Sequence, residues 1–166
     1  MTMPGTVHTR IDNRLLHGQV VQFWIPFLEV ERLIIADDEV AGQPSLLAVY
    51  RMAAPANLAV QAVPVAELPR ELGRGEAATT LVLLGEVSSA ARAREAGFRP
   101  SRVVLGNVHA APQRLRITDA VHLSPAETDE LVEFVRGGAE VLIQTLPGET
   151  LRLAVDGKDV PRWSKR

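Results

Sequence analysis

Three residues with reactive or charged side chains stand close together near the amino end of the chain. Asp12, Arg14 and His17 fall within six residues, directly after a stretch that ends like a first β-strand. Gly18 and a helix-like apolar run follow. A histidine in such a loop lies near the amino end of a helix, where free N–H groups and the helix dipole attract anions. The pattern therefore indicates a site that carries a phosphoryl group.

The chemistry expected there is nucleophilic attack by an imidazole. Neutral imidazole is a good nucleophile near neutral pH, because its ordinary pKa is about 6.5. His17 could accept a phosphoryl group, hold it as a phosphoramidate and release it to a hydroxyl. Transfer then needs positioning and charge neutralisation, for which Arg14 is the first candidate and Arg10 the second. Asp12 could orient the imidazole or its loop, and Gly18 would let backbone N–H groups approach the phosphoryl oxygens.

Composition sets the broad class of protein. A length of 166 residues predicts one domain spanning 1–166, with a less regular tail at 148–166. No apolar run approaches the ~20 residues that span a bilayer, and the polar start gives no signal peptide, so we expect a cytoplasmic protein. The absence of cysteine excludes disulfides and thiolate chemistry. A net charge of -2 argues against nucleic acid, and the four histidines lack the spacing of metal ligands, so no metal or cofactor is expected.

Apolar runs alternate with helix-patterned segments along the chain. Continuous runs such as Leu81–Leu84 and Val103–Leu105 are typical of strands buried on both faces of a parallel sheet. The pattern predicts a single-domain α/β fold with a mostly parallel, doubly wound sheet of about six or seven strands flanked by helices. The predicted strands are Gly5–Arg10, Arg32–Ala36, Ala59–Val63, Thr80–Leu84, Arg102–Leu105, Ala120–Leu123 and Glu140–Thr145. The predicted helices are Gly18–Leu28, Pro44–Ala54, Val65–Gly73, Ser88–Ala96 and Pro125–Arg136.

Local signals refine several of these elements. Ser124 and Glu127 have the spacing of a capping box at the start of the last helix. Pro26 should end or kink the first helix. In the tail, Leu151–Val155 could form an edge strand, and Asp156–Gly157 is a turn signal.

Polar residues follow several of the predicted strands. They are Asp37 and Asp38 after the second strand, Glu86 and Ser88 after the fourth, and Asn107 and His109 after the fifth. Ligand sites in such sheets form at the carboxyl ends of the strands, so Ser88, Asn107 and His109 are candidates for phosphate contacts beside His17. Asp37 is expected to order its own loop or cap a helix.

The chain also resembles a known family. The stretch Arg10–Val20, read as Arg-Ile-Asp-x-Arg-Leu-x-His-Gly-Gln-Val, resembles the start of IIB components of the bacterial phosphotransferase system (PTS), in the mannose/fructose/sorbose family. Further matching landmarks are Asp37–Val40, Arg51–Pro55, Gly106–His109, Ile117–Thr118 and Gln144–Pro147. Members of this family often carry a hydroxyl or amide residue where Glu86 stands here, and a carboxylate there would repel a phosphoryl group.

The resemblance implies a specific role for the histidine. His17 would accept phosphate from a phosphohistidine on a IIA protein or domain and pass it to sugar held by membrane IIC and IID partners. Arg14 and Asp12 would support this step, which needs no nucleotide or metal. The protein could then be peripheral to the membrane through IIC and IID, and a homo-oligomer stays open.

Other readings of the same residues stay open at this point. His17 could be a surface or helix-capping residue, and His109 could serve its loop backbone. The scaffold could also be regulatory, with the phosphorylation state of His17 controlling partner binding without sugar transport. A receiver-like domain phosphorylated on an aspartate such as Asp37 is less favoured, because no lysine follows a late strand. An exposed remnant of the Phe23–Phe27 aromatic stripe could dock a partner.

Overall fold

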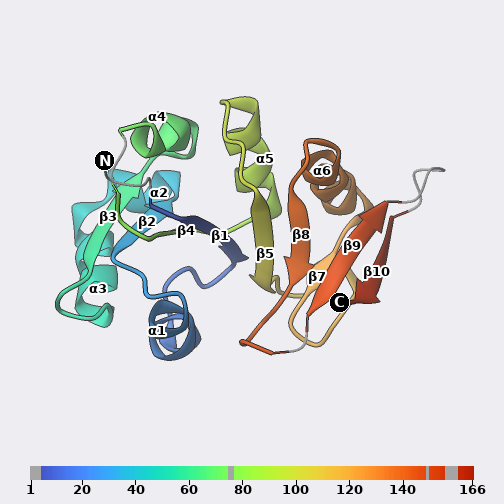
Figure 1. Cartoon of the computed structure of the whole chain (residues 1–166), viewed down its shortest axis with the longest axis horizontal. Helices are drawn as coiled ribbons and strands as arrows, with labels where there is room; N and C mark the ends of the chain where they lie inside the picture. The colour runs from blue at the N-terminus through green and yellow to red at the C-terminus, as the bar shows by residue number, and fades with distance from the viewer. Residues whose placement is uncertain (1–4, 75–76, 149, 156–160) are drawn as a thin grey trace.

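A mixed eight-stranded sheet forms the centre of the molecule (Figure 1). The computed structural model describes residues 5–74, 77–148, 150–155 and 161–166. The strand order is β10-β9-β8-β5-β1-β4-β2-β3. The six strands from β8 to β3 run parallel, whereas β9 and β10 are antiparallel additions. The strands are β1 (Val7–Asp12), β2 (Arg32–Ala36), β3 (Ala59–Val63), β4 (Thr80–Leu84), β5 (Arg102–Asn107), β8 (Glu140–Ile143), β9 (Leu151–Val155) and β10 (Pro161–Lys165).

The predicted α/β class and mostly parallel sheet are confirmed, but the strand count differs. The main sheet has eight strands instead of six or seven, and the predicted strand Ala120–Leu123 is not one of them. That segment contributes β7 (His122–Leu123), which pairs with β6 (Leu115–Arg116) in a separate two-stranded sheet. In the tail, the predicted strand Leu151–Val155 forms as β9, but it lies between β8 and β10 instead of at the edge. The edge strand is β10, which was not predicted and pairs with β9. The Asp156–Gly157 turn signal lies outside the described residues.

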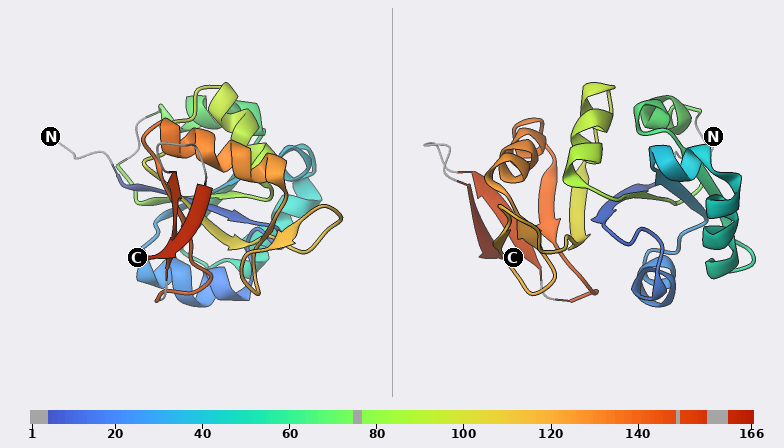
Figure 2. Two further views of the ribbon diagram at one scale, coloured as in Figure 1. Left: turned by 90° about the vertical axis from the view of Figure 1, so that its right-hand side faces the viewer. Right: turned by 180° about the vertical axis from the view of Figure 1, so that it is seen from behind.

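Helices cover the two faces of the sheet unequally. The helical elements are η1 (Val20–Trp24), α1 (Ile25–Phe27), α2 (Asp38–Gly42), α3 (Pro44–Ala53), η2 (Val65–Glu67), α4 (Leu68–Leu72), α5 (Val87–Glu95) and α6 (Pro125–Arg136). Side chains of α4, α5 and α6 pack on one face, and those of η1, α1 and α3 pack on the other. Figure 2 shows α3 and the β9–β10 hairpin at opposite ends of the molecule. None of the helices in the described ranges is long and apolar enough to cross a bilayer.

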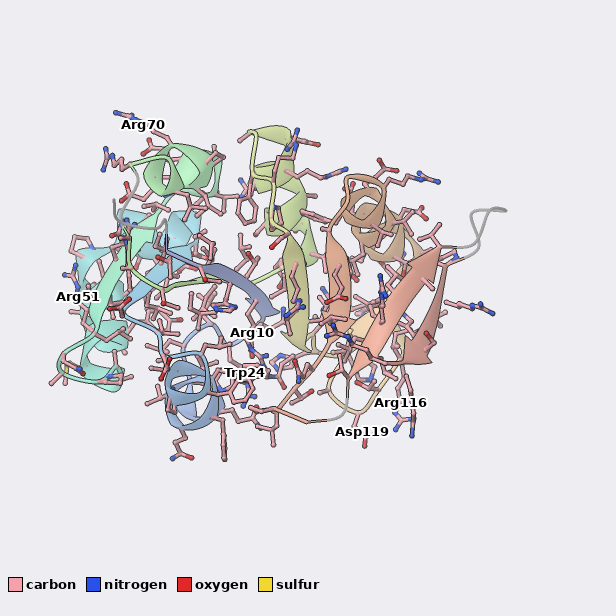
Figure 3. All side chains as sticks on the ribbon, in the orientation of Figure 1. Arg10, Trp24, Arg51, Arg70, Arg116 and Asp119 are labelled. Carbon is pink, nitrogen blue, oxygen red and sulfur yellow. The ribbon has the colours of Figure 1, made fainter. Side chains whose placement is uncertain are left out.

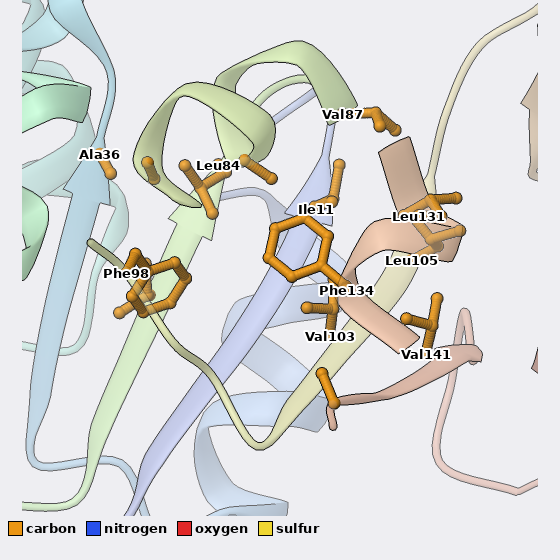
Figure 4. Packing of buried hydrophobic residues seen from close by; sticks show 14 of the residues in the cluster. Ile11, Ala36, Leu84, Val87, Phe98, Val103, Leu105, Leu131, Phe134 and Val141 are labelled. Atoms are coloured by element: carbon orange, nitrogen blue, oxygen red, sulfur yellow. The ribbon is translucent and has the colours of Figure 1, made fainter. Parts of the chain in front are cut away.

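The larger core lies between the sheet and helices α4, α5 and α6 (Figure 4). Ile11, Leu84, Leu105 and Phe134 are almost fully buried there. Burial of each such side chain stabilises the fold by about 1.5–3 kcal/mol. The apolar strand centres are therefore packed on both sides, and these packed strands hold the polar residues at their carboxyl ends in fixed positions.

The helix after β1 is continuous but not a regular α-helix. Helical structure begins at Gly18 and runs through η1 and α1 to Phe27. The N–H of Ile25 donates to the carbonyl oxygen of Val20, which is the wider π-helical spacing. Pro26, which lacks an N–H, is thus accommodated inside the helical run instead of ending it near Trp24.

The remaining helices follow their local signals closely. Helix α6 has the predicted bounds and the predicted capping box between Ser124 and Glu127. Helix α2 was not predicted, because it is only five residues long. The Asp37 side chain accepts from the N–H of Val40 and caps it, which is the structural role expected for that residue.

Candidate functional site

Asp12 is the centre of the site. It is the last residue of β1 and is completely buried. Its Oδ2 atom accepts hydrogen bonds from Nε2 of His17 and from Nδ2 of Asn107, each at 2.8 Å. Its Oδ1 atom accepts from the backbone N–H of Arg14 at 3.0 Å. One carboxylate therefore fixes both the loop and the imidazole.

The contact with Asp12 also decides which nitrogen of His17 can react. A carboxylate accepts hydrogen bonds, so Nε2 is assigned as the nitrogen that carries the proton. The lone pair of neutral imidazole then lies on Nδ1, which becomes the nucleophilic atom. The side chain of His17 is 13% exposed, so the ring is held firmly but is still reachable from outside.

The helix that starts at Gly18 provides an anion-binding edge beside His17. The carbonyl oxygen of His17 accepts from the N–H of Val21 at 3.0 Å, which makes His17 the cap of this helix. The N–H groups of the first turn have no acceptor within an α-helix and can bind phosphoryl oxygens. A Cβ added at Gly18 would meet nothing within 4 Å, so the space beside Gly18 itself is open.

A tight turn brings His17 back to Asp12. The N–H of Leu15 donates to the carbonyl oxygen of Asp12 at 2.9 Å, and Leu15 adopts a φ of 55°. The left-handed conformation costs a leucine about 1–2 kcal/mol. The buried Leu15 side chain packs into the core beneath η1, and this contact offsets the strain.

Arg10 supports Asp12 from inside the protein instead of contacting phosphate. The side chain is 2% exposed and donates to the carbonyl oxygens of Gln144, at 2.8 Å, and Thr145, at 3.0 Å. Its guanidinium lies 4.8 Å from the ring centre of Trp24 (Figure 3), and its Nε is 3.5 Å from Oδ2 of Asp12. Burial lowers the pKa of Arg10 to about 10, although Asp12 raises it in part. The expected phosphate contact from Arg10 is therefore replaced by charge compensation for Asp12.

Sequence reasoning missed Asn13, which joins three loops. Its Nδ2 donates to the carbonyl oxygen of Gly85, and its Oδ1 accepts from the backbone N–H of His109, both at 2.6 Å. Its own N–H donates to the carbonyl oxygen of Asn107 at 2.9 Å. The loops after β1, β4 and β5 are therefore held together by one amide. The sequence signal that could have identified Asn13 is its position between Asp12 and Arg14.

Arg114 is a second residue that was missed, and it bears on the unexpected Glu86. Its Nη2 atom lies 3.0 Å from a carboxylate oxygen of Glu86 and 2.6 Å from one of Glu127. The hydrogen bond to Glu127 raises the pKa of Arg114. Arg114 also donates to the carbonyl oxygen of His109 at 2.8 Å. The negative charge of Glu86 is thus paired, which reduces the repulsion expected for a phosphoryl group.

The other predicted residues lie at the same edge with fewer contacts. Arg14 is exposed and donates to Oε1 of Gln19 at 3.1 Å. Ser88 is exposed in the first turn of α5, which follows β4. His109 is exposed and contacts Asn13 and Arg114 through its backbone. Asn107 is buried and committed to Asp12, so its side chain orients the carboxylate.

The aromatic residues of the first helix divide between core and surface. Trp24 is buried, and its Nε1 donates to the carbonyl oxygen of Thr145 at 2.9 Å. Phe23 and Phe27 are exposed to 46% and 63%. Within the described ranges, no group of three or more histidine and acidic side chains is arranged to hold a metal ion.

Fold and site together define a parallel α/β protein with an aspartate-oriented histidine at the start of a helix. Residues 6–154 match the family described as "PTS system sorbose subfamily IIB component". The chain therefore belongs to this family and is a IIB component of the sugar phosphotransferase system, which confirms the resemblance seen in the sequence.

Named relatives and solved structures agree with this assignment. The chain is 26% identical to the PTS system fructose-specific EIIB component of Bacillus subtilis (strain 168), over 89% of this chain and 91% of that protein. It is also 26% identical to the N-acetylgalactosamine-specific phosphotransferase enzyme IIB component 2 of Escherichia coli (strain K12), over 89% and 94%. The crystal structure of manxB from Thermoanaerobacter tengcongensis superposes with a TM-score of 0.78 at 29% identity, covering 89% of this chain and 92% of that one.

Proposed function

We propose that this chain is a phosphohistidine carrier. The Nδ1 atom of His17 takes a phosphoryl group from a IIA phosphohistidine and passes it to a sugar held by membrane IIC and IID partners. The observation that carries the proposal is the 2.8 Å hydrogen bond between Nε2 of His17 and the buried Asp12. It leaves Nδ1 as the free nucleophile at the open start of a helix.

Two transfers complete the reaction. In the first, the Nδ1 lone pair of His17 forms a bond to phosphorus, and the nitrogen–phosphorus bond of the donor breaks, returning its electron pair to the donor imidazole. In the second, a sugar hydroxyl oxygen attacks phosphorus, the bond to Nδ1 breaks, and a base on the sugar side takes the hydroxyl proton. The Nε2 proton stays on His17 throughout, where Asp12 stabilises the positive charge of the phosphorylated ring.

The surrounding residues neutralise the phosphoryl charge and fix the geometry. The first-turn N–H groups after Gly18 can donate hydrogen bonds to the phosphoryl oxygens. Arg14, exposed beside them, can swing from Gln19 to the phosphoryl group. Ser88 and the loop at His109 lie at the same edge of the sheet and could add hydrogen bonds.

The partners are inferred from the family. One relative, 25% identical over 81% of this chain, is named the PTS system mannose-specific EIIAB component of Escherichia coli (strain K12), and the chain covers 42% of it. That name supports a IIA partner as donor. Named sugars differ between relatives, being fructose in one and N-acetylgalactosamine in another, so the proposal leaves the sugar open. We expect the chain to act at the cytoplasmic side, peripheral to IIC and IID.

Intact-mass analysis tests the carrier role. The chain is incubated with phosphoenolpyruvate, enzyme I, HPr and the IIA protein of the same genome. Wild type and the His122→Ala control should each gain one phosphoryl group, and His17→Ala should gain none. Heteronuclear NMR of the product should place phosphorus on Nδ1. A phosphorylated His17→Ala variant, or phosphorus on Nε2 of His17, would refute the assignment.

A further inference from the structure

The side chain of Glu86 does not cap the helix that it precedes. Glu86 is the N-cap residue of α5, a position where serine, threonine, aspartate and asparagine are preferred, and its carboxylate makes no capping hydrogen bond. It pairs instead with Nη2 of Arg114, at 3.0 Å, in the segment between β5 and β6. The side chain of Glu86 is 48% exposed, whereas that of Arg114 is 14% exposed. A solvated carboxylate therefore holds a nearly buried guanidinium on a neighbouring loop.

This ion pair completes a closed ring of contacts between the loops after β1, β4 and β5. Nη1 of Arg114 donates to the carbonyl oxygen of His109 at 2.8 Å. The N–H of His109 donates to Oδ1 of Asn13, and Nδ2 of Asn13 donates to the carbonyl oxygen of Gly85, both at 2.6 Å. The peptide bond from Gly85 to Glu86 leads back to the starting residue. We call this set the three-loop ring: Asn13, Gly85, Glu86, His109 and Arg114.

The three-loop ring contacts the His17 loop at two residues. Asn13 belongs to that loop and directly follows Asp12. A Cβ built at Gly85 would lie 3.7 Å from Cδ2 of Leu15, the residue of the tight turn that brings His17 back to Asp12. The loop after β4 is therefore packed against this turn and is also hydrogen-bonded beside it. Opening the ring would remove support from the turn that positions His17.

The ring is joined to the core through α6. Nε of Arg114 donates to both carboxylate oxygens of Glu127, at 3.1 and 3.0 Å. Glu127 is itself fixed by the capping box at the start of α6. Arg114 therefore keeps one carboxylate partner when Glu86 is replaced, so such a substitution opens the ring at a single contact.

We propose that Glu86 is a positioning residue for phosphoryl transfer, which closes the three-loop ring and thereby holds the His17 loop in its reactive geometry. The inference rests on the proposed carrier function. A misplacement of about 1 Å at a reacting group can slow a reaction about 100-fold, so a contact away from the reacting atoms can govern the rate. A carboxylate that only repelled the phosphoryl group would slow transfer, and its removal would raise the rate. A positioning carboxylate predicts the opposite sign.

Single-turnover transfer from purified phospho-IIA of the same genome measures that sign. Glu86→Ala should lower the limiting rate constant about tenfold, with the half-saturating concentration of phospho-IIA changed by less than about twofold. Glu86→Gln keeps an oxygen that can accept from Arg114 and should recover most of the lost rate. The matched control is Glu130→Ala, because Glu130 is 40% exposed and pairs at 2.7 Å with Arg94, which also has a second carboxylate partner in Glu133. This control removes the same charge between α5 and α6 and should leave both constants unchanged.

Opening the ring at another contact gives an independent check. Asn13→Ala should lower the limiting rate constant similarly, and Asn13→Ala/Glu86→Ala should be no slower than the slower single variant, because one lost contact already opens the ring. Thermal melts confirm that each variant folds. A Glu86→Ala rate at or above that of wild type, an equal loss in Glu130→Ala, or multiplied losses in the double variant would overturn the positioning role alone. Failure of wild type to accept phosphate from its own IIA would overturn the proposed function and this inference with it.

Discussion

Gly106 occupies a position that only glycine can fill, and its replacement should disable the support behind the phosphoryl site. The register of β1 against β5 shifts between Ile11 and Asp12, so that Gly106 forms a bulge. A Cβ built at Gly106 would overlap the Nη2, Cζ and Nε atoms of Arg10. Gly106→Ala must therefore displace a buried guanidinium or move the strand.

The cost can be worked from the contacts that Arg10 would lose. It donates two hydrogen bonds to carbonyl oxygens, at 2.8 and 3.0 Å, and stacks on Trp24. Hydrogen bonds to charged groups contribute about 1.5–3 kcal/mol each, and a displaced buried charge beside Asp12 costs about 3–5 kcal/mol. Displacing the guanidinium is what breaks the two hydrogen bonds, so these contributions overlap and are not added. We expect Gly106→Ala to lower the free energy of unfolding by about 3–5 kcal/mol, a large part of the ~5–15 kcal/mol typical of a domain.

Urea unfolding followed by circular dichroism measures this loss. Gly42→Ala is the matched control, because a Cβ there meets nothing within 4 Å, and it should change stability by less than about 1 kcal/mol. If the clash with Arg10 is the cause, Arg10→Ala/Gly106→Ala should be no less stable than Arg10→Ala alone. Full additivity of the two substitutions, or a Gly106→Ala variant as stable as the control, would refute the reasoning.

Three further predictions concern charged residues. Asp12→Asn should slow phosphoryl acceptance by His17 about 100-fold or more, because the carboxylate no longer fixes the Nε2 proton; quenched-flow transfer assays with IIA measure the rate, circular dichroism checks the fold of the variant, and a rate near wild type would contradict the prediction. Glu71→Gln should lower the free energy of unfolding by about 1–3 kcal/mol, because the charged hydrogen bond between Glu71 and the buried Arg32 is weakened; urea unfolding measures the loss, and an unchanged midpoint would contradict it. Burial raises the pKa of Glu127, but hydrogen bonds from its neighbours outweigh this and lower it overall. The contribution of ionised Glu127 to the free energy of unfolding is therefore fully present above its unfolded pKa of about 4.3 and is lost as pH falls through the lower folded pKa. Glu127→Gln should reduce the loss of stability with falling pH in acid unfolding curves, and an unaltered profile would count against this prediction.

Strands that are buried on both faces were predictable, because such strands have continuous apolar sequences. Leu81–Leu84 is such a run, and the predicted strand Thr80–Leu84 has the observed bounds. The same logic could not find β10 (Pro161–Lys165), whose side chains alternate and whose outer face is open. Helix α2 was not predicted for another reason, because five residues are too few to show a helical periodicity.

The site was predictable where its contacts are local and obscure where they are distant. His17 and Asp12 are five residues apart, and their types and order already suggested an oriented imidazole. The bonds of Asn13 reach Gly85 and His109, which lie 72 and 96 residues away. The sequence also could not show where the side chain of Arg10 points. Strand alternation allows it to face either the interior or the phosphoryl site, and the bulge at Gly106 that makes room for it is seen only in the structure.

The site must hold the Nε2 proton of His17 and must also avoid repelling the phosphoryl group, and different residues meet these two electrostatic requirements. Asp12 must be negative and buried to hold the Nε2 proton of His17, yet a bare buried carboxylate would repel the incoming phosphoryl group. Arg10 compensates that charge from behind, on the side away from the open helix start. The phosphoryl group therefore meets first-turn N–H groups instead of an unbalanced carboxylate. Arg10 is itself anchored on the carbonyl oxygens of Gln144 and Thr145, directly after β8, so the charge that compensates Asp12 keeps a fixed position while the phosphoryl group arrives and leaves.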